Sequence, residues 1–378
     1  MNPQPPQKRV LVLSLRTRRS AILAALGMAA LGGLLPLAAT TLSDELAVML
    51  LYFGRPVDQW RAMTPVSCTP WLREVGFANS PQTCEDALRA QVDHHTATTS
   101  AGRRAHFVIS NEPQMGSQSV DGTTSASLTP QAPIWLHIHG LNGNYLHGLR
   151  YLDAAKRLGF RLISAEYVNH GLSDYDGKGA AYGCKEAEDV VAVTSAVLHK
   201  YPSSDILLTA SSMGTMAVAL AEAQLAAIDG HHQIVAIALE NPPTNVRDLV
   251  ATVEPGSFLP GTLVDLTLRR AEQQSGYDFA QCSPLKAYGT FSHPTLIQHA
   301  KTDNLTPYAM GEKVYATLPT RIPSQLRLYS EGAHSAVWNA QPQEFEEDLM
   351  AMFEEGRAWR NTLARAPAAQ QGSLARQD

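Results

Sequence analysis

From residue 133 onward, short runs of apolar and often β-branched residues alternate with longer stretches that have the 3.6-residue spacing of amphipathic helices. This alternation is typical of a mainly parallel sheet with helices on both faces. The sequence therefore predicts an α/β fold. We expect strands at 134–137, 161–165, 205–210, 234–239, 295–298 and 326–329. We expect helices at 146–158, 186–201, 214–227, 311–318 and 343–359.

The segment 209–214 reads Thr-Ala-Ser-Ser-Met-Gly and lies between an expected strand and an Ala-rich expected helix. It has the pattern of a nucleophile elbow, a sharp turn that exposes a serine beyond the end of a strand. Ser212 fits because Ala210 and Gly214 are small enough to let the helix pack closely against the strand. Ser211 would place a methionine at a small-residue position. We therefore predict that Ser212 is a nucleophile, although alanine at 210 stands where glycine is commoner.

Two loops after late strands supply the partners that a serine nucleophile needs. His334 follows the last expected strand, where it can take the proton of the serine, and Asp303 follows the preceding strand, where it can fix the tautomer of the histidine. The chain order of serine, aspartate and histidine is the order found on α/β sheets with a nucleophile elbow. Glu240, directly after the strand at 234–239, is an alternative acid.

A glycine-containing turn at 139–144 follows the first strand of the alternating region. Acyl transfer develops an oxyanion, which backbone N–H groups stabilise in a site that excludes water. We assign the two donors to the N–H groups of Leu141 and Met213, with His139 and Gly140 as supporting residues of the turn. A glycine-rich turn without a catalytic role is the alternative.

Residues 242–288 interrupt the alternation, because they are rich in proline, glycine and apolar residues and contain no clear strand. We expect this insertion to be a lid over the carboxyl ends of the strands, where open α/β sheets bind their ligands. It belongs to an expected main domain at 105–363. Residues 44–104 form an N-terminal extension to which we assign no role, and the small, polar tail at 364–378 is expected to be disordered.

Basic residues precede an apolar run at 20–42, and no acidic residue occurs before Asp44. This pattern predicts that residues 1–43 are a targeting segment, either a cleaved signal peptide or a retained transmembrane helix. The basic flank orients the N-terminus to the cytoplasm and the rest of the chain outside. We therefore expect an exported protein, periplasmic or anchored to the membrane, and keep a buried core helix as the alternative.

The four cysteines of an exported chain are able to form disulfides. Cys68 and Cys84 are the favoured pair, since closing the short loop between them contributes about 3 kcal/mol. Four reduced thiols are the alternative. No Cys-x-x-Cys or His-Cys cluster occurs, so we expect no metal.

Charge argues against a nucleic-acid partner. The 378 residues carry a formal net charge of -5, and beyond the first twenty positions the basic residues are scattered along the chain. Nucleic-acid binding needs basic residues gathered on one face. We therefore expect no nucleic acid among the partners.

The segments above resemble the α/β-hydrolases of the serine aminopeptidase, monoglyceride lipase and lysophospholipase-like branch. The resemblance covers roughly 133–353 and lies in the turn at 139–144, the segments 165–167 and 171–173, the elbow, and the loops that carry Asp303 and His334. It implies the α/β-hydrolase fold and a two-step acyl-enzyme mechanism without a cofactor, in which Ser212 attacks an ester or amide carbonyl. The stretch 168–171 departs from the family, which often has an arginine and a second glycine there.

We expect a serine hydrolase of carboxylic esters that takes a small-molecule or lipid ester, because the apolar lid favours an acyl or alkyl substrate. A serine peptidase with the same triad is one alternative. It would need acidic groups in the lid to hold a peptide amine, which Glu254, Asp265 and Glu272 could supply. A catalytically silent binding protein is the other alternative, although no member of the triad is missing.

Overall fold

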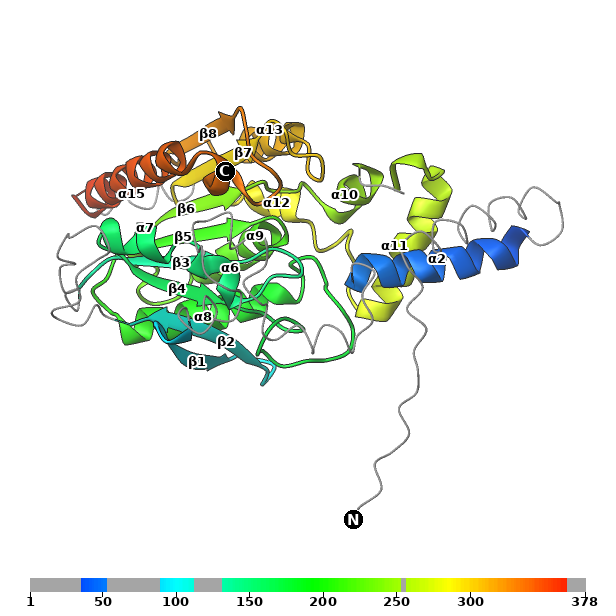
Figure 1. Ribbon diagram of the computed structural model, residues 1–378, viewed down its shortest axis with the longest axis horizontal. Helices are drawn as coiled ribbons and strands as arrows, with labels where there is room; N and C mark the ends of the chain where they lie inside the picture. The colour runs from blue at the N-terminus through cyan, green and yellow to red at the C-terminus, as the bar shows by residue number, and fades with distance from the viewer. Residues whose placement is uncertain (1–34, 53–88, 112–130, 253–255, 366–378) are drawn as a thin grey trace, which may run out of the picture.

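The computed structural model describes residues 35–52, 89–111, 131–252 and 256–365. Its centre is an eight-stranded sheet with the order β1-β2-β4-β3-β5-β6-β7-β8 (Figure 1). β2 is antiparallel to both β1 and β4. The strands β4, β3, β5, β6, β7 and β8, which follow one another in the sheet in this order, all run parallel. The strands are β1 (Val92–Thr98), β2 (Arg104–Ser110), β3 (Ile134–Ile138), β4 (Arg161–Ala165), β5 (Ile206–Ser211), β6 (Ile234–Glu240), β7 (Thr295–Ala300) and β8 (Ser324–Tyr329).

The sheet confirms the predicted α/β fold with mainly parallel strands. Each strand expected from the sequence is present, with both ends within two residues of the expected position. The five strands β3 to β7 are buried along their whole length. A parallel strand covered on both faces reads as a continuous apolar run, which is why these strands could be found from the sequence.

β1 lies before residue 105, the expected start of the main domain, and extends the sheet into the segment expected to be a separate extension. Its sequence gives little sign of a strand, because Val92 and Ala97 are its only buried residues. An edge strand with one largely exposed face lacks the apolar run of its central neighbours. The division into domains stays a prediction.

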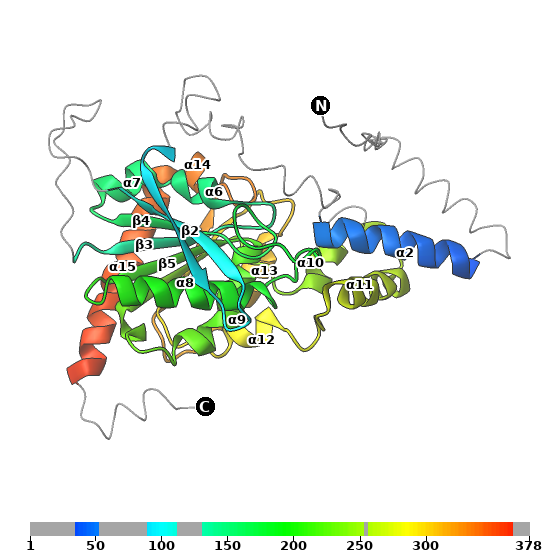
Figure 2. The ribbon, with the colours of Figure 1, turned by 90° about the horizontal axis from the view of Figure 1, so that it is seen from below.

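Helices cover both faces of the sheet (Figures 1 and 2). On one face, α8 and α9 pack against the strands, and on the other α6, α7 and α15 do so. The helices of the described chain are α2 (Leu35–Tyr52), α6 (Tyr145–Leu149), α7 (Leu152–Arg157), α8 (Glu186–Lys200), α9 (Met213–Leu225), α10 (Val246–Thr252), α11 (Gly261–Ser275), α12 (Pro284–Tyr288), α13 (Tyr308–Thr317), α14 (Val337–Ala340) and α15 (Pro342–Arg365), with short 3-10 turns η1 (His231–Gln233) and η2 (Gly256–Phe258).

The single helix expected at 146–158 is two short helices, α6 and α7. The chain breaks between them at Arg150 and Tyr151, whose side chains are both buried and both reach Glu240. The apolar spacing continues through the break, so the sequence pattern alone did not show it.

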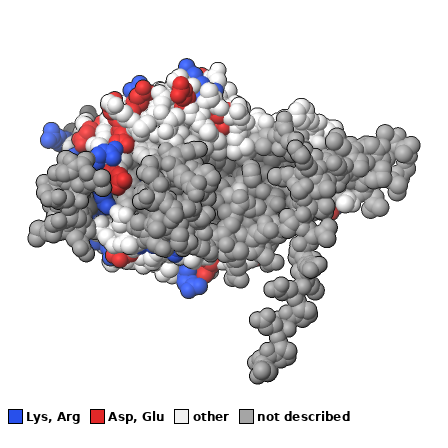
Figure 3. Space-filling model, viewed as in Figure 1, with Lys and Arg blue, Asp and Glu red and all other residues white. Residues whose placement is uncertain are grey.

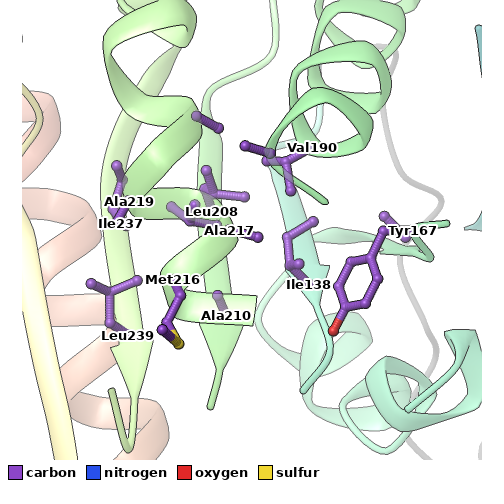
Figure 4. Packing of buried hydrophobic residues seen from close by; sticks show 14 of the residues in the cluster. Ile138, Tyr167, Val190, Leu208, Ala210, Met216, Ala217, Ala219, Ile237 and Leu239 are labelled. Atoms are coloured by element: carbon purple, nitrogen blue, oxygen red, sulfur yellow. The ribbon is translucent and has the colours of Figure 1, made fainter. Parts of the chain in front are cut away.

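The core on the α8 and α9 face shows why α9 is apolar around most of its circumference. Figure 4 shows Met216 and Ala217 of α9 beside Leu208 and Leu239 of the sheet. α9 is buried almost throughout, because it lies between the sheet and its neighbours α8 and α12. This packing fixes the first turn of α9, which begins directly after Ser212.

α2 and α11 lie side by side and project away from the sheet (Figures 1 and 2). Arg270 and Asp44 form an ion pair between them, and the Tyr182 hydroxyl donates to the Leu50 carbonyl oxygen at 2.8 Å. The described part of the interval expected to be a lid, 242–288, contains the helices α10, α11 and α12 joined by turns, and no strand. Its longest helix, α11, packs on α2. No helix within the described ranges is long and apolar enough to cross a membrane.

Several sequence-based predictions lie outside the described residues. They include most of the apolar run at 20–42, the pairing of Cys68 with Cys84, and the tail beyond residue 365. The remaining cysteines form a disulfide, Cys184–Cys282, which joins the segment before α8 to the segment between α11 and α12.

Charged side chains are mixed in sign on the face shown in Figure 3, where Lys and Arg atoms lie among Asp and Glu atoms of the described residues. Across those same residues, no group of three or more His, Cys, Asp and Glu side chains is placed to hold a metal ion.

Candidate active site

Ser212 lies on the sharp turn between β5 and α9, beyond the carboxyl end of the strand. Its backbone adopts φ 50° and ψ -124°, a conformation that is uncommon for a residue with a side chain. The Ser212 N–H donates to the Glu240 carbonyl oxygen at 2.9 Å, which ties the turn to the end of β6. The turn therefore holds the serine in a fixed place at the edge of the sheet.

Small residues around the turn allow the close approach that the elbow pattern predicts. A Cβ atom on Gly214 would lie 2.4 Å from the His139 carbonyl oxygen, and one on Gly140 would lie 3.1 Å from the Cβ of Ser212. Ala210 is buried in β5. Glycine at 214 lets the first turn of α9 pack directly on the loop after β3.

The structure brings Ser212, His334 and Asp303 together in one hydrogen-bonded chain. His334 Nε2 lies 2.6 Å from Ser212 Oγ, and His334 Nδ1 lies 2.8 Å from Asp303 Oδ2. The three residues follow β5, β8 and β7, whose carboxyl ends share one edge of the sheet. An ionised carboxylate only accepts hydrogen bonds, so Nδ1 of His334 is the donor and Nε2 accepts from the serine hydroxyl.

Asp303 lies in a buried and strongly hydrogen-bonded environment. The Thr306 hydroxyl donates to Oδ2 at 2.6 Å, and the N–H groups of Leu305 and Thr306 donate to Oδ1 at 2.8 and 2.9 Å. Burial alone would raise the pKa of Asp303, but the interactions with His334 and Thr306 outweigh it and lower the pKa to about 2. The carboxylate therefore stays ionised at neutral pH and can orient His334.

Two contributors to this environment were not singled out from the sequence. Asn241, with a left-handed φ of 51°, directly follows β6 and donates from Nδ2 to Asp303 Oδ2 at 2.5 Å. His299 Nε2 lies 2.7 Å from the Thr306 carbonyl oxygen and supports the same loop. The available signal for Asn241 was a polar residue directly after a strand, at a position where asparagine tolerates a left-handed backbone.

Glu240, the alternative acid, does not contact the histidine. Its carboxylate pairs with Arg150 at 3.0 Å and accepts the Val337 N–H at 2.9 Å. His334 Nδ1 instead bonds Asp303. The geometry therefore favours Asp303 over Glu240 as the partner of His334.

The expected oxyanion donors lie on the two segments that flank Ser212. Met213 is the first residue of α9, and Leu141 follows Gly140, which packs directly against the serine. Neither N–H group donates a hydrogen bond to another described residue. The role of the two groups as oxyanion donors stays a prediction.

Buried histidines shape the loop that carries Leu141. His139 Nδ1 lies 2.7 Å from the Gly140 carbonyl oxygen, and the Tyr167 hydroxyl donates to the His139 carbonyl oxygen at 2.7 Å. Burial lowers the pKa of His139 well below its usual range and lowers that of His170 to about 3. These rings are neutral at pH 7, so they support the loop through hydrogen bonds and packing.

Comparison with known proteins gives a structural likeness and one distant sequence relative. No family model matches the chain. The uncharacterized protein YqkD of Bacillus subtilis (strain 168) is 27% identical over 201 residues, which cover 52% of this chain and 63% of that protein, less than two thirds of its length. The esterase Pf2001 of Pyrococcus furiosus, in two crystal forms, superposes with TM-scores of 0.51 and 0.52 at 16% and 17% identity. In both crystal forms the superposition covers 71% of this chain. It covers 94% of the esterase chain in the first form and 93% in the second.

Proposed function

We propose that this chain, which has the α/β-hydrolase fold, is a serine hydrolase that cleaves carboxylic esters. The observation that carries the proposal is the continuous hydrogen-bonded chain from Ser212 Oγ through His334 to Asp303 at the carboxyl edge of the sheet. The likeness to the Pyrococcus furiosus esterase concerns the fold, so the activity is argued from the site.

In the first step, Ser212 Oγ attacks the ester carbonyl carbon while His334 Nε2 takes the hydroxyl proton. The carbonyl electrons move to oxygen, and the N–H groups of Leu141 and Met213 stabilise the oxyanion. When the oxyanion collapses, the bond to the alcohol oxygen breaks, and His334 returns its proton to that oxygen. An acyl-serine remains on the enzyme.

In the second step, water attacks the acyl-serine as His334 takes one of its protons, and the acid leaves as the proton returns to Ser212 Oγ. His334 becomes cationic twice in each cycle, and the Asp303 carboxylate stabilises this charge. A neutral asparagine at 303 would favour the wrong tautomer, and we expect it to lower kcat by about 10⁴-fold. No step needs a cofactor.

The contacts of the acidic residues between α10 and α12 favour an esterase over a peptidase. Asp265 forms an ion pair with Arg247, and a carboxylate oxygen of Glu272 accepts the Phe279 N–H at 3.0 Å. Both carboxylates are thus engaged within the chain, which leaves them less available to a peptide amine. Glu254 lies outside the described residues.

The class of substrate and the location rest on the sequence. We propose a small-molecule or lipid ester, because the insertion between β6 and β7 carries apolar residues such as Phe258, Leu259 and Leu263. We also propose an exported protein, periplasmic or held at the membrane through residues 20–42, because of the basic and apolar pattern of the N-terminus.

Labelling by a fluorophosphonate probe tests the proposal. We expect the probe to modify the full-length protein at Ser212, located by mass spectrometry of the modified peptide. Ser212→Ala should remove both the labelling and p-nitrophenyl ester hydrolysis, lowering kcat at least about 10³-fold. Ser211→Ala, which removes the neighbouring hydroxyl, should keep most of the activity. Equal turnover in Ser212→Ala and the natural protein would refute the assignment.

A further inference from the structure

Arg150 and Glu240 form a buried ion pair that the mechanism above does not use. Arg150 Nη2 and Glu240 Oε2 are 3.0 Å apart, and the two side chains are only 2% and 4% exposed. Arg150 lies at the break between α6 and α7, and Glu240 is the last residue of β6. The Tyr151 hydroxyl lies 3.5 Å from the same Glu240 oxygen.

The pair holds the loop of His334 at two points just after the histidine. Arg150 Nη1 donates to the Ser335 carbonyl oxygen at 2.5 Å, and the Val337 N–H donates to Glu240 Oε1 at 2.9 Å. Ser335, directly after His334, has a left-handed φ of 53°. Such a backbone persists only when its surroundings fix it, and these two bonds lie one and three residues beyond the histidine.

Glu240 also holds the nucleophile. Its backbone carbonyl oxygen accepts the Ser212 N–H at 2.9 Å, while its carboxylate accepts the Val337 N–H. One residue at the end of β6 therefore contacts the backbone beside both reacting side chains. The separation of Ser212 Oγ and His334 Nε2 depends on where these two backbone segments lie.

We propose that Arg150 and Glu240 are positioning residues that set the place of the His334 loop relative to Ser212. The proposal rests on the function proposed above. Neither side chain bonds Ser212 Oγ or a ring nitrogen of His334, so both act through the backbone of the loop.

The desolvation cost of the buried Arg150–Glu240 pair is the physical reason to assign it a positioning role rather than a stabilising one. Taking two charges out of water has a large desolvation cost, and apolar residues of similar size often replace such a pair without loss of stability. The bonds to Ser335 and Val337 give the pair a geometric effect that apolar residues cannot reproduce. Misplacing a catalytic group by about 1 Å can lower the rate about 100-fold.

Two single variants test the proposal through a split between kcat and KM. Glu240→Gln keeps the volume and an acceptor for Val337 but removes the charge that faces Arg150, and Arg150→Met removes the donor to Ser335. We expect each to lower kcat for a p-nitrophenyl ester about 10- to 100-fold with KM within about twofold. A kcat within twofold of the natural protein in both folded variants would overturn the proposal.

Glu222→Gln is the matched control. Glu222 on α9 is also buried, and its carboxylate accepts from the Ser292 N–H at 2.7 Å and lies 2.9 Å from His293 Nδ1. The Glu222→Gln substitution therefore removes a comparable buried charge at a residue that does not contact the His334 loop. We expect it to lower the midpoint of thermal unfolding while kcat stays within about twofold. An equal fall of kcat in Glu222→Gln would mean that buried charge loss alone explains the effect, and would overturn the proposal.

A double variant covers the case in which a single variant fails to fold. Arg150→Met/Glu240→Leu leaves no uncompensated charge, so we expect it to fold and still to show the lower kcat. Restoration of kcat in this double variant would overturn the proposal.

Hydrogen exchange gives a readout that does not depend on activity. In the Arg150→Met/Glu240→Leu protein, which has no side-chain acceptor for the Val337 N–H, and not in Glu222→Gln, we expect the Val337 amide to exchange at least 10-fold faster than in the natural protein. Unchanged exchange in Arg150→Met/Glu240→Leu would overturn the positioning role. If the natural protein hydrolyses no ester, the proposed function fails, while the exchange of Val337 still decides whether Glu240 holds the loop.

Discussion

At the scale of single residues, Ser212 shows how backbone strain and reactivity are linked in this chain. Its left-handed φ of 50° costs of order 1–3 kcal/mol, and the surrounding contacts must maintain it. The bond from its N–H to Glu240 and the close approach of Gly140 do so. The strain turns the hydroxyl out of the strand and toward His334 Nε2.

Asp303 should make the stability of the protein depend on acid pH. Its pKa is about 2 in the folded chain and 3.8 in an unperturbed carboxyl group. A lowered folded pKa contributes stability that is complete above about pH 4 and is lost as the pH falls toward 2, and the shift corresponds to about 2 kcal/mol. We expect the free energy of unfolding, measured in urea at several pH values, to fall in this window.

Asp303→Asn is the control for this prediction. The asparagine does not titrate, so between pH 5 and pH 2 the variant should lose about 2 kcal/mol less than the natural protein. Parallel curves of unfolding free energy against pH for the two proteins would contradict the prediction.

The sequence was sufficient to propose Ser212, Asp303 and His334, because each lies in the turn or loop after a predictable strand and their order matches a known arrangement. It was not sufficient to find the hydrogen bonds around them. Asn241 and Thr306 reach Asp303 through loop backbones whose course depends on tertiary contacts.

The sequence also left Glu240 open as the acid, because its partners are distant in the chain. In the structure its carboxylate pairs with Arg150 and not with His334.

At the scale of elements, the contact between α9 and the loop after β3 depends on Gly214. A methyl group there would lie 2.4 Å from the His139 carbonyl oxygen and 2.8 Å from that of Ile138, and backbone atoms cannot move aside cheaply. We expect Gly214→Ala to lower the free energy of unfolding by about 1–3 kcal/mol and to lower kcat, because α9 and the Met213 N–H must shift. Urea unfolding and ester turnover measure the two effects.

Gly261→Ala is the matched control for that substitution. Gly261 begins α11, and a Cβ atom there would meet no atom within 4 Å. Alanine in a helix is more stable than glycine by roughly 0.5–1 kcal/mol, so this variant should lose neither stability nor activity. If Gly214→Ala behaved like Gly261→Ala, the tight packing at the elbow would be disproved.

The elements differed in how well the sequence predicted them. The central strands are apolar from end to end, because helices bury both of their faces. β1 is half polar, and the break between α6 and α7 lies at Arg150 and Tyr151, which both contact Glu240, a residue far away in the chain. Local patterns predict elements whose environment is uniform, and they fail where distant residues decide the backbone.

At the scale of the whole molecule, the part that projects from the sheet is joined to it by apolar packing, hydrogen bonds and a disulfide. α2 and α11 pack on each other, and the Ala180 N–H donates to the Leu51 carbonyl oxygen at the end of α2. Cys184–Cys282 adds a covalent link beside this contact, between the start of α8 and the segment that leaves α11. The disulfide therefore ties the returning end of the insertion to the helix layer that covers the sheet.

Removing this link should lower stability more than a typical substitution does. The bond closes a loop with a sequence separation of 98 residues, and a loop of that length restricts the unfolded chain strongly. We expect Cys184→Ala/Cys282→Ala to lower the free energy of unfolding by about 2–5 kcal/mol under oxidising conditions. Cys282 lies near the C-terminal end of the insertion, whereas Ser212 lies at the edge of the sheet. We therefore expect kcat of the folded variant to change much less than its stability. Unfolding of the variant at the same denaturant concentration as the natural protein would contradict the prediction, and faster hydrogen exchange confined to α11 would place the lost stability in the projecting part.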